Sequence, residues 1–392
     1  MIDLNFKPNR RMNNIHALRK YLHQNPELSG QEFETSKTIA TFLQQYQPDE
    51  LLEGLGNGTG VIAVYEPSEE VKKSIMFRCE LDALPIQEVN EFAHQSKFKK
   101  ISHKCGHDGH MAVMCAFAKK LAENKMQHTK VILLFQPAEE NGEGAVAIYN
   151  DTRFKTLNPD RVFALHNLPG YDFHDIVVKN HTFTCAVNSI IIKLHGKTAH
   201  AGEPENGDNP ALALAEIIKE YDQKNQPDAK KEKFTVLTPI YLTMGTEDYG
   251  ISAGYGEVHY TFRRALNVEM KALEEELEQI AIASAKKYNL QPEIFWTQRF
   301  SANENNPQAV DIVRQAARDS HFNLIERETP FQWGEDFGIF TENFAGAMFG
   351  LGSGKKTPNL HNPDYDWPDE ITETGAQIFF KISVVIYDIA VV

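Results

Sequence analysis

Short apolar runs in the first half of the chain each end near a polar residue that can bind a metal or move a proton. Rich in β-branched and aromatic residues, as buried strands are, they span residues 74–79, 131–135 and 162–165. Asp82, the pair Glu139 and Glu140, and His166 fall just after the ends of these runs. Because open α/β sheets bind ligands outside the carboxyl ends of their strands, the four side chains are predicted to gather at one sheet edge.

Helical patterns alternate with these strands. Ile15, Leu18 and Leu22 recur at helical spacing, and Ser29 followed by Glu32 resembles a capping box ahead of a second helix. Apolar strands alternating with helices predict an α/β fold with a mainly parallel sheet covered on both faces. A length of 392 residues predicts more than one domain.

The segment Cys105–His110 reads Cys-Gly-His-Asp-Gly-His and offers a thiolate and an imidazole two residues apart. These are ligand types that zinc and similar divalent metals select. The Ala-rich run after it predicts a helix, which would place Cys105 just outside a helix N-terminus, where a thiolate is favoured. A cysteine is more often a small core residue, so the segment gains its meaning from the strand-end residues above.

Composition limits the class of protein. The net charge of −14 and the pI near 5.6 oppose binding to nucleic acid or an anionic membrane. The segment Met1–Arg11 lacks the apolar core of a signal peptide, and no apolar stretch reaches the length of a membrane span. Four cysteines without disulfide spacing favour a reducing compartment, so a cytoplasmic protein is expected. Three of them, Cys79, Cys115 and Cys185, are expected to be packing residues.

From about residue 181 the pattern changes to strand, helix, strand, strand, helix, strand, the order of a ferredoxin-like split unit. The expected elements are residues 188–195, 211–221, 234–244, 257–263, 268–287 and 293–297. A helix and a strand then return at 309–317 and 344–351, ahead of His361.

Seven short motifs occur in order along nearly the whole chain. They are Glu-Leu-Asp-Ala-Leu-Pro at 80–85, Cys-Gly-His-Asp-Gly-His at 105–110, Gln-Pro-Ala-Glu-Glu at 136–140, Leu-His-Asn at 165–167, Thr-Ala-His-Ala at 198–201, Gly-Glu-Asp-Phe at 334–337 and Leu-His-Asn-Pro at 360–363. In this order they resemble the hippurate hydrolase and N-acyl-L-amino-acid amidohydrolase family, which is related to aminoacylases, carboxypeptidase G and plant auxin-conjugate hydrolases.

The resemblance implies two divalent metal ions per subunit, Zn, Mn, Co or Ni, and a general base, Glu139. The implied metal ligands are Cys105, His107, Glu140, His166 and His361, with Cys105 as a possible bridge. Asp82 matches an aspartate that orients a metal-binding group. His200 matches a histidine that reaches the substrate carbonyl, possibly in the partner subunit's site.

The resemblance also implies a catalytic domain in two parts, residues 1–180 and 300–392, interrupted by a lid at 181–299 through which a homodimer forms. Arg263, at the end of a lid strand, either clamps a substrate carboxylate or makes a surface ion pair. His103 and His110, beside the ligand pair, either contact the ligands or face solvent.

Three departures from the family bear on the substrate. Glu80 stands where members usually carry Asp, Glu205 replaces a common His, and Tyr249 takes the place of an asparagine that helps to hold the substrate. The accepted acyl group and amino acid therefore remain open.

The expected activity is hydrolysis of an N-acyl-L-amino acid to a carboxylate and a free amino acid. The alternatives are a related N-acetyl-diaminopimelate deacetylase or dipeptidase, and a metal-binding but catalytically silent family member. A nucleic-acid binder with a structural Cys/His site conflicts with the acidic charge.

Overall fold

The computed structural model describes residues 14–231 and 233–388, so the segment Met1–Arg11 lies outside the described part. These residues form two compact units. The first unit contains the described chain up to Phe183, the segment Asn303–Glu328, and the described chain from Asp336 onward. The second contains Thr184–Ala302 and Thr329–Glu335.

The first unit is built on an eight-stranded sheet of order β1-β2-β4-β3-β5-β16-β6-β15. Its strands are β1 (Glu50–Leu55), β2 (Gly60–Tyr65), β3 (Lys73–Glu80), β4 (Thr129–Gln136), β5 (Arg161–Leu168), β6 (Ile176–Val178), β15 (Leu324–Glu326) and β16 (Gly346–Gly352). The central strands β4, β3, β5 and β16 pair in parallel, whereas β1, β2 and β4 pair antiparallel. A separate two-stranded ladder joins β7 (His181–Thr182) to β14 (Glu304–Asn305).

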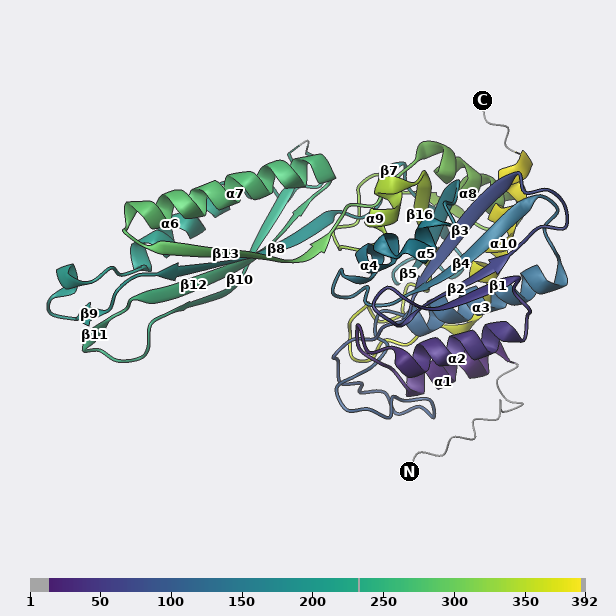
Figure 1. Ribbon diagram of the computed structural model, residues 1–392, viewed down its shortest axis with the longest axis horizontal. Coiled ribbons are helices and arrows are strands. Elements are labelled where there is room, and N and C mark those ends of the chain that lie inside the picture. The colour runs from purple at the N-terminus through teal and green to yellow at the C-terminus, as the bar shows by residue number, and fades with distance from the viewer. Residues whose placement is uncertain (1–13, 232, 389–392) are drawn as a thin grey trace. The chain divides into compact units, whose positions relative to one another are not determined.

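Helices lie on both sides of this sheet (Figure 1). They are α1 (Ile15–Gln24), α2 (Phe33–Gln44), α3 (His107–Glu123), α4 (Gly144–Asn150), α5 (Thr152–Lys155), α8 (Pro307–Asp319), α9 (Gly338–Asn343) and α10 (Thr372–Asp388). One apolar core joins the sheet to α3 and α10, where the ring of Phe77 lies 5.0 Å from Phe117 and 4.8 Å from Phe379. The expected α/β class is confirmed, with a sheet that is mixed and parallel at its centre.

Two local predictions were wrong. Ser29 and Glu32 do not form a capping box, because α2 begins at Phe33 and the N–H groups of Glu34 and Thr35 in its first turn donate to the side chain of Glu27. His166 lies inside β5 and not after it, since the strand continues to Leu168.

The second unit is a four-stranded antiparallel sheet of order β10-β12-β8-β13 with two helices packed on it. Its main elements are β8 (Ala186–His195), α6 (Ala211–Asp222), β10 (Thr235–Met244), β12 (Tyr255–Arg264), α7 (Asn267–Lys287) and β13 (Gln291–Phe300). A small ladder of β9 (Ala199–His200) and β11 (Ile251–Ser252) extends from it. This element order and strand order agree with the predicted ferredoxin-like unit.

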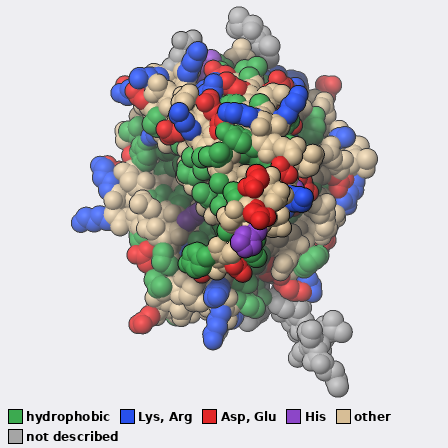
Figure 2. Space-filling view, turned by 90° about the vertical axis from the view of Figure 1, so that its left-hand side faces the viewer, with side chains coloured by type: hydrophobic (Ala, Val, Ile, Leu, Met, Phe, Trp, Pro, Cys, Tyr) green, Lys and Arg blue, Asp and Glu red, His purple; other side chains and the backbone are tan. Residues whose placement is uncertain are grey.

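Each unit has its own apolar core, and the core of the second unit includes Ile192, Tyr221 and Leu277. Apolar side chains are also exposed on the second unit, among acidic and basic ones (Figure 2). Within the described residues, no helix is both long and apolar enough to cross a membrane.

Candidate metal centre

The polar residues predicted at the strand ends come together with the Cys105–His110 segment. The donor atoms of Cys105, His107 and His166 all lie within 4.8 Å of one another. Those of Cys105, Glu140 and His361 form a second such group. The residues of these two groups are called the cluster below. Both groups contain Cys105, which is the arrangement that a ligand shared by two metal ions requires.

The distances between the donor atoms of these side chains are short enough for the side chains to share a bound ion. Cys105 Sγ lies 3.5 Å from Nε2 of His166. Glu140 has one carboxylate oxygen 3.7 Å from Nε2 of His107 and the other 3.8 Å from Nε2 of His361. Glu140 therefore lies between two imidazole rings that come from segments far apart in the sequence.

The backbone fixes which ring nitrogen of each histidine faces the group. Nδ1 of His107 donates to the carbonyl oxygen of Asp82 at 2.8 Å, and Nδ1 of His166 donates to that of Asn167 at 3.0 Å. In both rings Nε2 therefore faces the cluster, as the ligating nitrogen does in metal-binding histidines. Nε2 of His107 is buried and has no hydrogen-bond partner among the described residues, which is costly unless a cation occupies the space in front of it.

The electrostatics of the cluster favour positive charge. Burial lowers the pKa of His107, but its hydrogen bond to Asp82 and the charges of Glu80 and Glu140 outweigh burial and raise this pKa to about 10. The surroundings thus hold enough negative charge to stabilise a cation. The donor set of one thiolate, three imidazoles and a carboxylate suits a borderline-soft divalent metal.

Asp82 acts on two of the candidate ligands. Its Oδ2 accepts from the backbone N–H of Glu140 at 3.0 Å and from Oγ of Ser29 at 2.7 Å. Its Oδ1 lies 3.4 Å from Nδ1 of His107. Burial raises the pKa of Asp82, but the contacts with His107 outweigh it, so the pKa is lowered and the group is a carboxylate.

Glu139 lies beside the cluster. Its Oε2 is 3.9 Å from Nε2 of His107, and the donor atoms of His107, Glu139 and Glu140 form a third group within 4.8 Å. Its side chain is 7% exposed, so Glu139 is nearly enclosed and not a solvated loop residue. Adjacent carboxylates in one short loop thus serve the same cluster.

A buried polar network lies behind the candidate ligands. His110 donates from Nδ1 to Glu80 at 2.6 Å, and its Nε2 contacts Oδ1 of Asn167 at 2.8 Å. Asn167 in turn donates to the hydroxyl of Tyr365 at 2.5 Å. His110 is therefore buried and supports the cluster, and the interpretation that it faces solvent was wrong. Glu80, which replaces the usual Asp, contacts this network and also Arg78.

Sequence reasoning missed Arg78 and the role of Asp336. Arg78 donates to Asp336 at 2.5 Å and to Gln136 at 2.9 Å, and all three are buried. Asp336 also accepts from the backbone N–H of Ala145. Asp336 was predicted only as part of the motif at 334–337. The charged residue Arg78 inside the strand Lys73–Glu80 was the signal that could have indicated a buried acidic partner.

A second buried group surrounds His23. Its Nδ1 and Nε2 contact Asp108 at 2.8 Å and Glu88 at 2.9 Å, and Lys104 donates to the same Glu88 oxygen at 2.5 Å. His103 is also buried, so the interpretation that it faces solvent was wrong.

Cys79, Cys115 and Cys185 are buried as packing residues. Burial raises the pKa of Cys115, which keeps it a thiol.

The three predicted lid residues lie in the second unit. His200 pairs with Ile251 across the small ladder, and the N–H of Gly202 donates to its Nδ1 at 3.0 Å. Tyr249, which is 97% exposed, precedes Ile251 by two residues. Arg263 lies near the C-terminal end of β12, whereas the small ladder lies beyond its N-terminal end. Its Nε donates to the carbonyl of Gln332 at 2.7 Å. His200 and Tyr249 are thus neighbours, and Arg263 is not near them.

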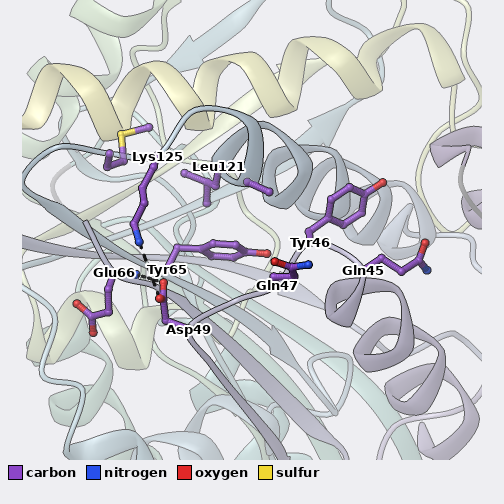
Figure 3. A pocket seen from close by; sticks show the side chains of 10 residues that line it. Gln45, Tyr46, Gln47, Asp49, Tyr65, Glu66, Leu121 and Lys125 are labelled. Carbon is purple, nitrogen blue, oxygen red and sulfur yellow. Dashed lines mark hydrogen bonds and ion pairs between the residues drawn. The ribbon is translucent and has the colours of Figure 1, made fainter. Parts of the chain in front are cut away.

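A cavity of about 350 Å³ in the first unit is separate from the cluster. Figure 3 shows Lys125 reaching toward Asp49 beside the ring of Tyr65. Nζ of Lys125 lies 3.9 Å from Oδ1 of Asp49. Tyr65 pairs with Val131 at the start of β4, whereas the loop with Glu139 follows the end of that strand. The cavity therefore adjoins the opposite edge of the sheet and contains none of the candidate ligands.

Known proteins resemble this chain over most of its length. The N-acetylcysteine deacetylase of Bacillus subtilis (strain 168) is 28% identical over 372 residues, covering 95% of this chain and 96% of that protein. The hippurate hydrolase of Campylobacter jejuni (serotype O:2, strain NCTC 11168) is 27% identical over 368 residues, covering 93% and 94%.

The solved structure of a dinuclear metal-binding peptidase of the M20 family from Bacillus subtilis superposes with a TM-score of 0.81 at 27% identity, covering 96% of this chain and 98% of that one. The family model for peptidase family M20/M25/M40 matches residues 76–383, which include every candidate ligand. The resemblance inferred from the motifs is confirmed: the chain belongs to peptidase family M20/M25/M40.

Proposed function

We propose that this chain is a metal-dependent amidohydrolase that cleaves N-acyl-L-amino acids to a carboxylate and a free amino acid. One observation carries the proposal: two groups of ligand atoms share Cys105, and Glu139 lies beside them. The similarity to a hippurate hydrolase and an N-acetylcysteine deacetylase supports this substrate class.

The residues present fit a pair of divalent ions. Five side chains would hold them, namely Cys105, His107, Glu140, His166 and His361. When bound, the ions would lower the pKa of a water molecule and polarise the carbonyl of the scissile amide. Zn, Mn, Co and Ni are the candidate metals, and the thiolate and imidazole ligands favour Zn among them.

Glu139 would act as the general base and then as the general acid. Its carboxylate would take a proton from the attacking water and deliver it to the departing nitrogen, so the proton balance closes on one residue. Asp82 would hold the ring of His107 and the backbone of Glu140 in place during these transfers, through the hydrogen bonds described above.

Replacing Glu139 with Gln tests this role. The Glu139→Gln variant should keep its metal content and lose about 10²- to 10⁴-fold in kcat, since the amide cannot carry the proton. Glu143→Gln, the same change at an exposed position in the same loop, should leave kcat unaltered. Full activity of Glu139→Gln would refute the assignment.

Replacing Cys105 with Ala tests the ligand set. Elemental analysis of the purified Cys105→Ala variant should show less metal per chain than the parent, because both groups of donor atoms lose a member. Unchanged metal content would count against ligation by Cys105.

A substrate panel separates the alternatives. Hippurate-like, acetyl-amino-acid and indole-acyl substrates would be assayed with Mn, Co, Ni and Zn, beside N-acetyl-diaminopimelate and dipeptides. Turnover of the last two alone would favour the related deacetylase or dipeptidase. Silence on every substrate would favour a catalytically inactive member of the family.

The second unit would supply residues that contact the substrate. Because Nδ1 of His200 accepts a hydrogen bond, the proton of its neutral ring is on Nε2, which is then free to donate to a carbonyl oxyanion. Tyr249 and Arg263 are the further candidates for substrate binding. His200→Ala should lower kcat more than it raises KM, and an unchanged kcat would remove His200 from this role.

We further propose a homodimer formed through the second unit. Its edge strand β10 exposes the apolar residues Ile240, Tyr241 and Leu242, each about half exposed. An apolar edge strand pairs readily with another chain, and a second copy of this unit offers the same surface. Light scattering should give twice the chain mass for the parent and the single mass for Leu242→Lys. Val89→Lys, at an exposed position of the first unit, is the control, and a parent of single mass would contradict the proposal.

A cytoplasmic location is the last part of the proposal. It is supported by four buried cysteines that form no disulfide among the described residues. Protein from the native host would be unfolded in denaturant directly on cell lysis, before air oxidation, and its thiols titrated. Four thiols per chain are expected, and a smaller number would argue for an oxidising compartment.

A further inference from the structure

Glu32 is a completely buried carboxylate that lies outside the seven motifs and the three ligand groups described above. Its Oε1 accepts from the backbone N–H groups of Gly30 and Ala138, each at 2.8 Å. Its Oε2 accepts from Oγ1 of Thr59 at 2.9 Å. The contact with Ala138 spans 106 positions of sequence and reaches the residue directly before Glu139.

Ala138 has an unusual backbone. Its φ is +51°, in the left-handed region that residues other than glycine seldom adopt. Such a conformation costs about 1–3 kcal/mol and persists only where the surroundings enforce it. Here the N–H of Ala138 donates to Glu32, and its carbonyl accepts from the N–H of Gly144 at 2.9 Å.

The next residues of the loop are held in the same way. The carbonyl of Glu139 accepts from Gly142 at 2.8 Å, and the N–H of Glu140 donates to Asp82. The residues on both sides of Glu139 are thus anchored by buried carboxylates. The N–H of Ala138 donates to Glu32, and the N–H of Glu140 donates to Asp82. Asp82 contacts two candidate ligands, His107 and Glu140, whereas the contacts of Glu32 described here include none of them.

We propose that Glu32 is the positioning residue for the general base: it holds Ala138 in the left-handed conformation that directs Glu139 at the reacting water. The proposal rests on the proposed function, because it assigns Glu139 the proton transfer. Without Glu32 the buried N–H of Ala138 loses its acceptor, and the backbone can relax to a negative φ that turns the Glu139 side chain away.

The same short segment supports both anchors. Ser29 donates to Asp82, and Gly30, with φ of +76°, donates to Glu32. The residues between α1 and α2 therefore act on the site, although they resemble a helix cap in sequence. The candidate ligand Glu140 keeps its own backbone anchor, Asp82, so loss of Glu32 should affect turnover and not metal content.

Two substitutions separate positioning from charge. Glu32→Gln keeps an oxygen at the Oε1 position and removes the charge, because the amide nitrogen can face the hydroxyl of Thr59, which can then accept. Glu32→Ala removes the acceptor altogether. Glu27→Ala is the matched control, since Glu27 also accepts from backbone N–H groups, of Glu34 and Thr35, but at the start of α2.

Steady-state kinetics on the best N-acyl amino acid would be measured together with metal content and thermal unfolding. Glu32→Ala should lose about 10- to 100-fold in kcat, as misplacement of a reacting group by about 1 Å does, with unchanged KM and metal content. Glu32→Gln should stay within about threefold of the parent. Glu27→Ala should lower the unfolding temperature and leave kcat unaltered.

Three outcomes would overturn the inference. A parental kcat in Glu32→Ala would show that Ala138 needs no anchor. An equal loss in Glu32→Gln and Glu32→Ala would assign the effect to charge and not to position. An equal loss of kcat in Glu27→Ala would assign it to general destabilisation. A parent without activity, or an active Glu139→Gln variant, would instead refute the proposed function.

Discussion

His23 shows how a single buried residue can make stability depend on pH. Both of its ring nitrogens face carboxylates, Asp108 and Glu88, and its side chain is fully buried. Burial lowers the pKa of His23, but the charge of Asp108 and the hydrogen bonds outweigh burial and raise it from 6.5 to about 9. The ring is therefore a cation in the folded protein at neutral pH.

The sign of the pH dependence follows from this pKa. A folded-state pKa above the unfolded one stabilises the protein fully below pH 6.5, and the contribution is lost as the pH rises through 9. The shift corresponds to on the order of 3 kcal/mol. Urea unfolding at fixed metal concentration should therefore show a stability difference between the parent and His23→Gln that is large at pH 6 and smaller at pH 10. A difference that stayed constant would contradict the interpretation.

At the scale of elements, α3 is set against the rest of the first unit by a glycine. A Cβ on Gly109 would lie 1.8 Å from Cδ2 of Trp367, whose ring also packs edge-on against His110 at 5.5 Å. The close approach of the helix to this ring is possible only without a side chain at position 109.

Gly109→Ala should therefore destabilise the protein by about 1–3 kcal/mol, as overpacking of a core does, and lower metal occupancy by displacing Trp367 and His110. Urea unfolding and elemental analysis would measure the two effects. Gly250→Ala is the control, because a Cβ there meets only an ordinary contact at 3.4 Å. Parental stability of Gly109→Ala would show that Trp367 can move without cost.

The elements that hold the site differ in how far sequence could predict them. Asp82 and Glu139 were placed correctly at sheet ends, because apolar periodicity marks strands and their ends. Ser29 and Glu32 were misread as a helix cap, since the local pattern is the same whether the partners are local or more than 50 positions away. The left-handed turn at Ala138 has no local signal, because its acceptor is supplied by tertiary contact.

The resemblance supplied what periodicity could not. The strand Gly346–Gly352 pairs with β5 in the middle of the sheet, and no pattern within 344–351 indicates which strand is its neighbour. Polar strands such as Glu50–Leu55 were also not predicted, because an exposed edge strand carries little apolar alternation.

At the scale of the whole molecule, two separate cores predict two unfolding steps. All five candidate ligands lie in the first unit, so divalent metal should stabilise that unit, by about 4 kcal/mol at a metal concentration 1,000 times the dissociation constant. Calorimetry with and without chelator should shift one transition only. Leu277→Ala, in the second core, should lower the other transition, and a single transition moved by both changes would contradict this division.

The interruption of the first unit has a consequence for synthesis on the ribosome. The second unit is nearly continuous in sequence, and its four-stranded sheet and both helices are complete once residue 302 has emerged. The strand β5, by contrast, waits for β16 to cover its apolar edge, and the cluster waits for His361. Until β16 has been synthesised, the nascent chain carries an unpaired sheet edge at β5. Its folding should therefore depend on chaperones more than the stability of the complete folded protein would suggest.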